Sequence, residues 1–319
     1  MSLITELRRK RIPFGISASN SAEITLCCPF CVQRGHTADT EFKLGVNVKN
    51  GKGHCFRCDW KSQRSHWYLA RALDLGELNF GDFVHEEEKQ VEQKELKLPP
   101  DFTRLWYRGK RPKGFLYEMA FNYLIERRVS LAQIEKHKIG VSFVGEFAYR
   151  IIFPVYQKGE LIGIVARDFT DNQKAKYKNS VGKKYLYNLK SRHKRRFSAI
   201  LCEGIFDCLA LERTFPQYDV IALLGHSLSE DQISDLTWYH KLVFWCDPDR
   251  VGIKAFLSLA EQFVVLGSKV FVITPHPSKD AGSMTTKELV TRFENKLRKW
   301  SPVLSLRLRN TLNLRLLND

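Results

Sequence analysis

The sequence contains no long hydrophobic run, and this absence narrows the class of protein. A membrane-spanning helix needs roughly 18 to 20 consecutive apolar residues, and no stretch of these 319 residues comes near that length. The opening segment, Met1–Arg8, lacks the apolar core that a secretory signal requires. We therefore expect a soluble protein of the cytoplasm, or of the host cytoplasm if a phage encodes it, with no membrane partner.

The sequence also lacks a Gly-x-x-x-x-Gly-Lys-Ser/Thr loop. In ATP-driven motors the backbone N–H groups of this loop wrap around the nucleotide phosphates. Its absence excludes a helicase motor of that type within this chain.

Acidic residues are scarce relative to basic ones. The chain has 51 Lys and Arg against 35 Asp and Glu, which gives a formal net charge of +16. Such an excess is typical of proteins that bind a polyanion, most often a nucleic acid. A basic surface without a specific partner is the alternative.

The eight cysteines are clustered, which argues against a disulfide framework. Two Cys-x-x-Cys pairs, separated by 23 residues, lie near the N-terminus: Cys28, Cys31, Cys55 and Cys58. Each tight pair can aim two thiolates at one ion, which is the pattern of a tetrahedral structural zinc site. The spacer between them predicts a β-hairpin that turns at Asn50-Gly51. We expect one Zn²⁺ in an N-terminal β ribbon.

Other residues near these pairs leave alternatives open. Cys27, His36 and His54 are possible substitute ligands, although the spacing favours Cys28, and His54 fits a polar surface group better. Basic and aromatic residues of the ribbon would suit contact with single-stranded nucleic acid. The aromatic rings could instead form the small core of the ribbon, and we favour this for Phe56. This set comprises Lys43, Lys49, Lys52, Arg57, Lys61, Arg64, Phe42, Phe56 and Trp60.

Sequence patterns in the middle of the chain predict a linker, helices and a hairpin. A helix is expected at residues 65–75, and the charged stretch that ends in Pro99-Pro100 is typical of an exposed linker. Helical spacing covers residues 115–140, with a break at Val129-Ser130. Two apolar strands then form a hairpin at Lys158-Gly159.

A strongly basic segment follows this hairpin. Residues 174–196 contain ten Lys and Arg and no acid, with Tyr177, Tyr185 and Tyr187 between them. Cations can hold phosphates while the rings stack on bases. We favour a phosphate-binding role over a merely solvated face.

Four apolar runs, at residues 197–202, 220–224, 242–246 and 269–274, alternate with helical patterns at 205–213, 229–238 and 251–266. This alternation predicts βαβ units and a parallel sheet that is buried on both faces. The first run leads into Glu203-Gly204 and the third into Asp247-Pro248-Asp249. Ligands bind at the carboxyl ends of such strands, so we expect these acids, with Asp207 and Asp280, to meet in one metal site. Asp207 could alternatively be a first-turn helix residue, and Asp247 or Asp249 a helix cap.

These acidic motifs resemble the Toprim signature, which is shared by DnaG-type primases, topoisomerases, OLD nucleases and RecR proteins. Other segments resemble the DnaG primases, in the same order along the chain. They are the basic region around Arg150, Arg167 and Lys176-Tyr177-Lys178-Asn179, the Leu224-Gly225-His226 loop, Lys279-Asp280 and the cysteine ribbon. The resemblance runs from about residue 25 to residue 282 and is nearest to a small, phage-type member.

The resemblance implies a role for each matching residue. Glu203, Asp247 and Asp249 would bind catalytic Mg²⁺ or Mn²⁺, with support from Asp207 and Asp280. Nucleotide phosphates and the template–primer strand would be held by Arg150, Arg167, Lys176, Asn179 and Lys279. The ribbon would help to select the initiation site. The implied activity is synthesis of short RNA primers from NTPs on a single-stranded DNA template, with a replicative helicase as a further partner.

Three departures from the family pattern are visible. The ribbon has four cysteines where bacterial members often have a histidine, His226 replaces a threonine, and Ala281-Gly282-Ser283 replaces acids that commonly follow Lys-Asp. A different Toprim enzyme, such as a nuclease or topoisomerase, and a non-catalytic RecR-like module are the alternatives.

The expected organisation is a multidomain α+β and α/β chain. It comprises a zinc ribbon (1–84), a linker (85–99), a basic part of the RNA polymerase domain (100–196), a Toprim subdomain (197–284) and a tail (285–319). In the tail, Phe293, Leu297 and Trp300 have helical spacing, and alternating leucines follow. We expect this tail to pack on the main domain or to contact a helicase.

Overall fold

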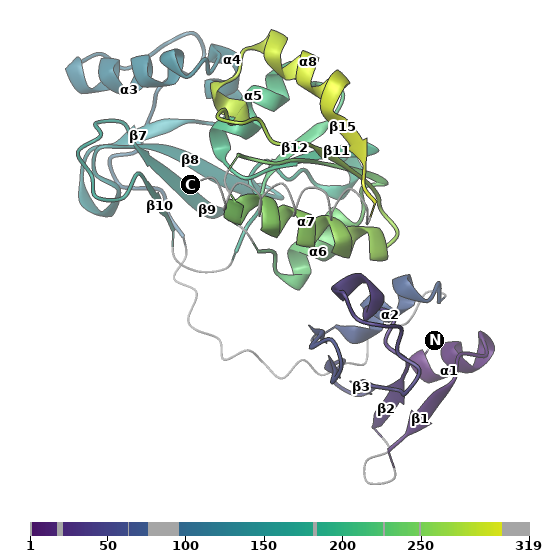
Figure 1. The fold of residues 1–319 in the computed structure, drawn as a ribbon. Helices are drawn as coiled ribbons and strands as arrows, with labels where there is room; N and C mark the ends of the chain where they lie inside the picture. Colours follow the sequence, from purple (N-terminus) through teal and green to yellow (C-terminus); the bar gives the residue numbers. More distant parts are fainter. Residues whose placement is uncertain are drawn as a thin grey trace. The chain divides into compact units, whose positions relative to one another are not determined.

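A computed structural model describes residues 2–17, 22–62, 64–75, 96–180, 184–225, 227–248 and 250–301 of the chain (Figure 1). The chain divides into two compact units, residues 1–92 with 258–269 and residues 93–257 with 270–319. Most of the expected linker, residues 85–95, lies outside the described part, so the proposed domain boundaries stay predictions. None of the described helices is long and apolar enough to cross a bilayer.

The N-terminal ribbon is an antiparallel sheet with strand order β1-β2-β3-β4-β5. The predicted hairpin is confirmed, because β3 and β4 pair and Gly51 adopts a positive φ of 74° in the turn between them. Ile24, Leu26, Leu44 and Val46 fill its core. Its elements are α1 (Leu3–Arg9), β1 (Phe14–Ile16), β2 (Glu23–Leu26), η1 (Val32–Arg34), β3 (Leu44–Asn47), β4 (Gly53–Cys55), β5 (Lys61–Ser62) and α2 (Ser65–Ala72).

A second antiparallel sheet has the order β10-β9-β8-β7-β6. The predicted hairpin at Lys158-Gly159 and the helix break near Val129 are both confirmed. Ser130 and Gln133 cap the second helix reciprocally, which explains why it begins there. The elements are β6 (Thr103–Arg104), α3 (Phe115–Glu126), α4 (Leu131–Lys136), β7 (Gly140–Ser142), η2 (Gly145–Phe147), β8 (Arg150–Gln157), β9 (Glu160–Asp168) and β10 (Tyr177–Asn179).

The third sheet has the order β12-β11-β13-β14-β15 and contains the predicted parallel strands. Strand β11 pairs in parallel with both β12 and β13. Figure 1 shows α5 and α8 on one face of this sheet and α6 and α7 on the other, as buried parallel strands require. The elements are η3 (Arg192–Lys194), β11 (Ser198–Cys202), α5 (Ile205–Thr214), β12 (Asp219–Ala222), α6 (Glu230–Leu236), β13 (Lys241–Trp245), α7 (Arg250–Val265), β14 (Lys269–Ile273), η4 (Ala281–Ser283), α8 (Thr286–Lys296) and β15 (Leu297–Lys299).

The second and third sheets share one hydrophobic core. The Phe153 ring of β8 lies 5.7 Å from the Phe206 ring of α5, edge to face, and Tyr187 bridges to Ala222 of β12. The side-chain amide of Gln133 donates to the carbonyl of Leu209 at 2.7 Å. This shared packing holds the hairpin β8–β9 against α5, the helix that carries Asp207.

The helical spacing of Phe293, Leu297 and Trp300 is interrupted in the structure. Helix α8 ends at Lys296, and Leu297–Lys299 form β15, an antiparallel edge strand on β14. The prediction of one continuous helical pattern was therefore wrong at Leu297 and Trp300. The alternating leucines, residues 304–316, lie outside the described residues.

Candidate metal centres

The four predicted cysteines form a compact cluster. The sulfurs of Cys28, Cys31, Cys55 and Cys58 all lie within 4.8 Å of one another, and all four residues are buried. Two of the Sγ–Sγ distances are 3.9 Å (Cys28–Cys58) and 3.7 Å (Cys31–Cys55). A tetrahedral zinc ion with Zn–S bonds of about 2.3 Å places its sulfurs about 3.8 Å apart. The cluster therefore fits Zn²⁺.

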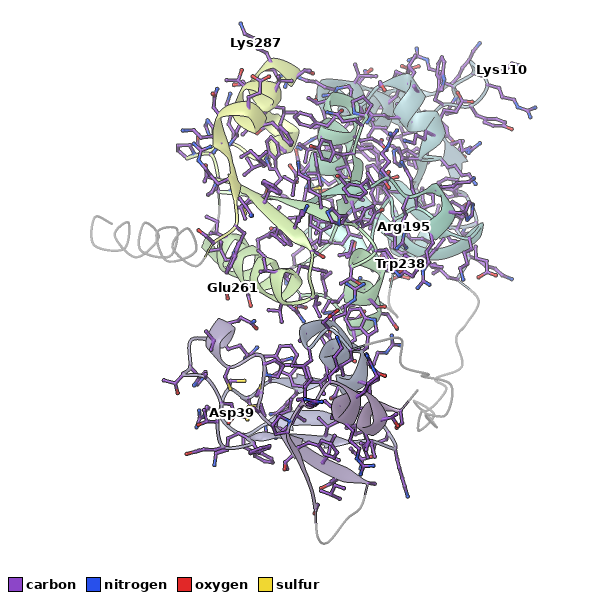
Figure 2. The ribbon with its side chains drawn as sticks, turned by 90° about the vertical axis from the view of Figure 1, so that its right-hand side faces the viewer. Asp39, Lys110, Arg195, Trp238, Glu261 and Lys287 are labelled. Carbon is purple, nitrogen blue, oxygen red and sulfur yellow. The ribbon has the colours of Figure 1, made fainter. Side chains whose placement is uncertain are left out.

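Asp39 fixes the loop beside this cluster (Figure 2). Its carboxylate accepts hydrogen bonds from the backbone N–H groups of Cys28 at 2.8 Å, Glu41 at 2.9 Å and Lys43 at 2.8 Å. Burial alone would raise the pKa of Asp39, but these donors hold the pKa below its usual value. A carboxylate with several N–H donors orders a loop well because each bond is charge-assisted.

The structure settles where the other ribbon residues lie. The His54 Nε2 atom contacts the Asp59 carboxylate at 3.0 Å, so this side chain faces away from the cysteines. Trp60 stacks on Phe30 at 4.4 Å and is buried in the core. The prediction that Phe56 belongs to that core was wrong, because its side chain is 76% exposed.

A second candidate centre lies where β11 ends and α5 begins. Asp207, in the first turn of α5, is buried, and its Oδ1 atom accepts the N–H of Gly282 at 2.7 Å. Burial, followed by the nearby charges of Asp280 and Glu203, raises the pKa of Asp207 to about 7. Asp280 caps the turn η4 through the N–H of Ser283. The Gly282 bond therefore joins the loop that carries Asp280 to the first turn of α5, which directly follows Glu203-Gly204.

Asp247 approaches the same region from β13. Burial and the thiol of Cys208 raise the pKa of Cys202, and the charges of Asp207 and Asp247 raise it further. Asp247 follows β13, which pairs in parallel with β11, so its charge acts at the same end of the sheet as that of Asp207. In the described part of the chain, only the cysteines approach one another closely enough to form a ready-made ligand cluster, and Asp249 lies outside that part.

A layer of arginines and aromatic rings borders the acids. The guanidinium of Arg167 lies 4.8 Å from the Tyr177 ring centroid, and its Nε donates to the Tyr123 hydroxyl at 2.7 Å. Desolvation raises the pKa of Tyr177 to about 12, with Arg167 lowering the pKa and Asp207 raising it. The charge of Asp207 therefore acts on Tyr177, which Arg167 contacts. We call Glu203, Asp207, Asp247 and Asp280 together the acid site.

The sequence analysis missed Arg127 in this layer. The Arg127 guanidinium lies 4.9 Å from the ring centroids of both Tyr123 and Phe206, and the side chain is exposed. Its only sequence signal is its position at the end of a helix, directly after Glu126. Phe206 links it to the acids, because Phe206 directly precedes Asp207.

The remaining predicted phosphate ligands differ in exposure. Lys176 and Asn179 are exposed, whereas Lys279 forms an ion pair with Glu288 at 2.6 Å. Arg150 is buried, and its guanidinium donates to the carbonyls of Ala175 at 2.8 Å and Lys176 at 3.3 Å. In this structure Arg150 orders the loop that carries Lys176.

Comparison with known proteins places this arrangement in context. A family profile described as Toprim-like matches residues 200–285, the segment that contains the acids. The DNA primase of Campylobacter jejuni is 26% identical over 323 residues, which cover 84% of this chain and 51% of that protein. The DNA primase of Thermotoga maritima is 32% identical over 163 residues, covering 47% and 28%.

The chain resembles the DnaG-type DNA primases. This confirms the family resemblance found in the motifs and the expected fold class, a zinc ribbon joined to a Toprim-containing core. The Aquifex aeolicus primase structure, with zinc-binding and RNA polymerase domains, has a TM-score of 0.44 and 19% identity, over 97% of this chain and 87% of that one. The chain spans about half the length of its C. jejuni relative.

Proposed function

We propose that the chain is a DNA primase, which synthesises short RNA primers from nucleoside triphosphates on single-stranded DNA. The observation that carries this proposal is the proximity of two features. The Gly282 N–H bonds to Asp207 and so joins the loop that carries Asp280 to the first turn of α5, while Arg127 contacts Tyr123 and Phe206, the residue before Asp207. Nucleotidyl transfer needs both features, because one holds divalent metal and the other holds phosphates and bases.

In this proposal Glu203, Asp247 and Asp249 hold Mg²⁺ or Mn²⁺, while Asp207 and Asp280 support them. Such ions prefer oxygen ligands and are commonly held by only a few carboxylates, with water and substrate phosphate completing the coordination. Divalent metal bound there would supply the charge neutralisation for in-line displacement at the α-phosphate of the incoming nucleotide. The hydrogen bond from Gly282 to Asp207 fixes the position of one carboxylate relative to the loop that carries Asp280.

Cations of the second sheet and of helix α3 would hold the substrates. Arg167 of β9 is stacked on Tyr177, and Arg127, at the end of α3, is stacked on Tyr123. Their guanidinium groups can therefore bind phosphates in a fixed orientation. Lys176 and Asn179 extend this surface, with Arg150 as the residue that shapes the loop. Lys279 would contribute only by leaving Glu288.

The zinc ribbon would contribute to the choice of the initiation site, and Phe56 is its exposed ring that could stack on a template base. Priming in the cytoplasm would follow unwinding by a replicative helicase, which we propose as the further partner. A phage origin also stays a proposal.

Primer synthesis tests this function directly. The purified protein is incubated with mixed-sequence single-stranded DNA, labelled NTPs and either Mg²⁺ or Mn²⁺. Wild type should give short RNA, whereas Asp247→Asn and Asp207→Asn should give at least about 100-fold less, since a lost metal ligand removes several kcal/mol of charge stabilisation. Asp171→Asn is the matched control, because Asp171 is exposed at a φ of 56° that asparagine adopts readily.

Other products would overturn the proposal. Shortened or relaxed DNA without RNA would indicate a Toprim nuclease or topoisomerase. DNA binding that survives in the aspartate variants, with no chemistry in wild type even when a helicase is supplied, would indicate a RecR-like binding module.

A further inference from the structure

A second cationic and aromatic cluster lies at the far edge of the second sheet. It is centred on a tight turn in which Tyr107 and Lys110 pair through their backbones. The turn follows β6 at one edge of the sheet, whereas Tyr177 is in β10 at the opposite edge. Residues 102–117 include Arg104, Arg108, Lys110, Arg111 and Lys113 and no acid.

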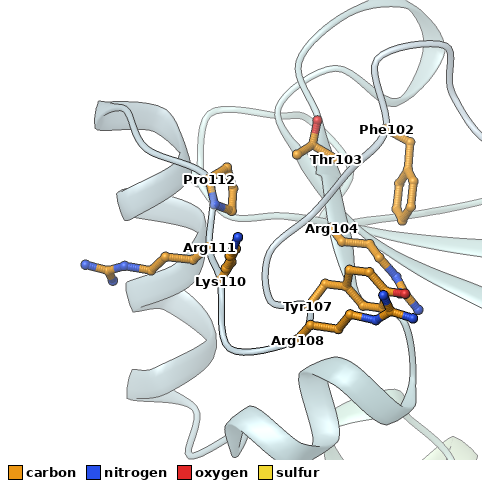
Figure 3. Close-up of a pocket in the computed structure, with 8 residues that line it drawn as sticks. All are labelled: Phe102, Thr103, Arg104, Tyr107, Arg108, Lys110, Arg111 and Pro112. Atoms are coloured by element: carbon orange, nitrogen blue, oxygen red, sulfur yellow. The ribbon is translucent and has the colours of Figure 1, made fainter.

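Two arginines of this cluster lie beside the Tyr107 ring (Figure 3). The guanidinium carbons of Arg104 and Arg108 lie 4.5 Å and 5.0 Å from the Tyr107 ring centroid. Tyr107 remains 43% exposed. A pocket of about 630 Å³ adjoins them, lined by Phe102, Thr103, Arg104, Tyr107, Arg108, Lys110, Arg111 and Pro112.

The charges of this cluster are only partly neutralised within the protein. Among the described residues, Arg111 pairs with Glu118 at 3.1 Å, but Arg104, Arg108 and Lys110 have no carboxylate partner for their side chains. Figure 2 shows Lys110 at the outer surface of its unit. Two guanidinium groups beside an exposed ring, with Lys110 in the same turn, are suited to a ligand that is both anionic and planar.

The backbone of the turn fixes the position of Arg108. Arg108 has a φ of 50° and Gly109 a φ of 75°, which is the conformation of a type I′ turn. Glycine and asparagine favour the first of these positions, whereas the Cβ of arginine makes it strained. The backbone N–H of Arg108 donates to the Glu135 carboxylate at 3.0 Å, and this bond holds the turn in place. The turn thereby holds the Arg108 guanidinium beside the Tyr107 ring.

We infer that this turn, Arg104 to Lys110, is a second binding site for single-stranded nucleic acid, separate from the acid site. Arg104, Arg108 and Lys110 hold backbone phosphates, and Tyr107 with its guanidinium neighbours stacks on a base. Single-stranded nucleic acid repeats phosphate and exposed base at short intervals, which this arrangement matches. The inference extends the proposed function, since the strand held here would be the template, but binding at this turn requires no catalysis.

The test measures binding of a fluorescein-labelled oligodeoxythymidine to the full chain by anisotropy, over a series of NaCl concentrations. Arg108→Asn removes the cation and suits the turn, so the melting temperature should stay equal or rise. Its Kd should increase at least about five-fold, and the slope of log K against log [NaCl] should become shallower by about 0.7. Tyr107→Leu should also raise Kd at least about five-fold through lost stacking, with a smaller change in slope.

The β8–β9 hairpin provides a matched control. Lys158 has a φ of 53°, is followed by Gly159 at 91°, and is exposed. Lys158→Asn therefore removes one charge from an equivalent turn and should leave Kd and the salt slope as in wild type.

Several results would overturn the inference. It fails if Arg108→Asn and Lys158→Asn behave alike, or if Arg108→Asn and Tyr107→Leu both bind as wild type. It also fails if polyglutamate displaces the oligonucleotide as well as unlabelled DNA does, because the site would then be a general anion surface. Failure of the proposed primase function would give a different result from failure of this inference. Wild type would then bind the oligonucleotide through this turn and yet make no RNA.

Discussion

The N–H of Gly282 donates to the Asp207 carboxylate at 2.7 Å, and this bond joins the first turn of α5 to the loop that carries Asp280. The two residues are 75 positions apart in the chain, so the bond fixes the acid site from two sides. The close packing around this bond also explains why glycine occupies position 282. A Cβ there would lie 3.2 Å from the Phe206 Cβ and 3.3 Å from the Asp207 Oδ1.

We predict that Gly282→Ala disturbs the acid site without unfolding the protein. The added methyl group crowds Phe206 and Asp207, so we expect the loop that carries Asp280 to shift by a few tenths of an ångström. Primer synthesis should fall about ten-fold or more, as misplacement of catalytic groups by about 1 Å costs much of the rate, while DNA binding stays within two-fold. Gly45→Ala is the control, because its Cβ would meet other atoms only at 3.8 Å. Equal activity of the two variants would argue against this coupling.

Removal of zinc should unfold the ribbon selectively. Binding energy at a structural four-cysteine site is folding energy, so a chelator takes it away. In a calorimetric melting experiment with the chelator, we expect the unfolding transition of the ribbon to disappear while the transition of the larger unit remains. Cys31→Ser should reproduce the effect, whereas Cys27→Ser should not, because Cys27 lies outside the cluster.

Asp39→Asn should weaken the ribbon without touching a cysteine. In wild type, three backbone N–H groups donate to the two oxygens of the Asp39 carboxylate. Asparagine would offer these donors only one oxygen, without a charge. We predict a loss of about 1.5–3 kcal/mol in the free energy of unfolding of the ribbon, and a lower zinc affinity in competition with a coloured chelator. Unchanged affinity would mean that the loop is held by the cysteines alone.

The Glu212 carboxylate should make stability depend on pH. It accepts from His137 at 2.8 Å and Lys136 at 2.6 Å, linking α4 to α5. Burial opposes its ionisation, but His137 and Lys136 hold the pKa of Glu212 well below its ordinary value of 4.5. A depressed carboxyl pKa gives stability that is full above the unfolded pKa and is lost as the pH falls below it.

Urea unfolding of wild type and Glu212→Gln checks this. Wild type should exceed Glu212→Gln in the free energy of unfolding by about 2–4 kcal/mol at pH 7. This difference should shrink progressively as the pH falls below about 4.5. A difference that is constant down to pH 3 would show that the carboxylate charge is irrelevant.

Arg127 should act on substrate binding more than on the chemical step. In Arg127→Gln we expect KM for NTPs to rise about ten-fold, as for one lost charge-assisted contact, with kcat within three-fold. Lys287→Gln, an exposed change on α8, is the control. A fall in kcat with unchanged KM would place Arg127 in the chemical step instead.

Much of the architecture could be predicted because buried strands and paired cysteines leave strong local signals. The β–α alternation of residues 197–274 and the Asn50-Gly51 turn are of this kind. The exception at Leu297 arose because pairing with Ile273 of β14 outweighed the local helical spacing. Phe56 could not be placed either, since the direction of its ring depends on the tight turn that brings Cys55 and Cys58 together.

The acid site was only partly visible in the sequence. The strand ends identified Glu203 and Asp247, but the burial of Asp207 and its bond to Gly282 depend on a loop distant in sequence. Arg127 and the strained Arg108 belong to no recognisable motif, because each acquires its surroundings only through tertiary packing.

Strand β15 has a practical consequence for truncation experiments. It covers the edge of β14 and presents Arg298 and Lys299 outward, where like charges discourage edge-to-edge association of separate molecules. Deleting residues 285–319 to look for a helicase contact would remove this strand together with Leu289, a fully buried core residue. The shortened protein would then expose the unpaired outer edge of β14 and tend to aggregate. A deletion that begins after residue 301 keeps that edge protected, so a lost interaction could be attributed to the removed segment itself.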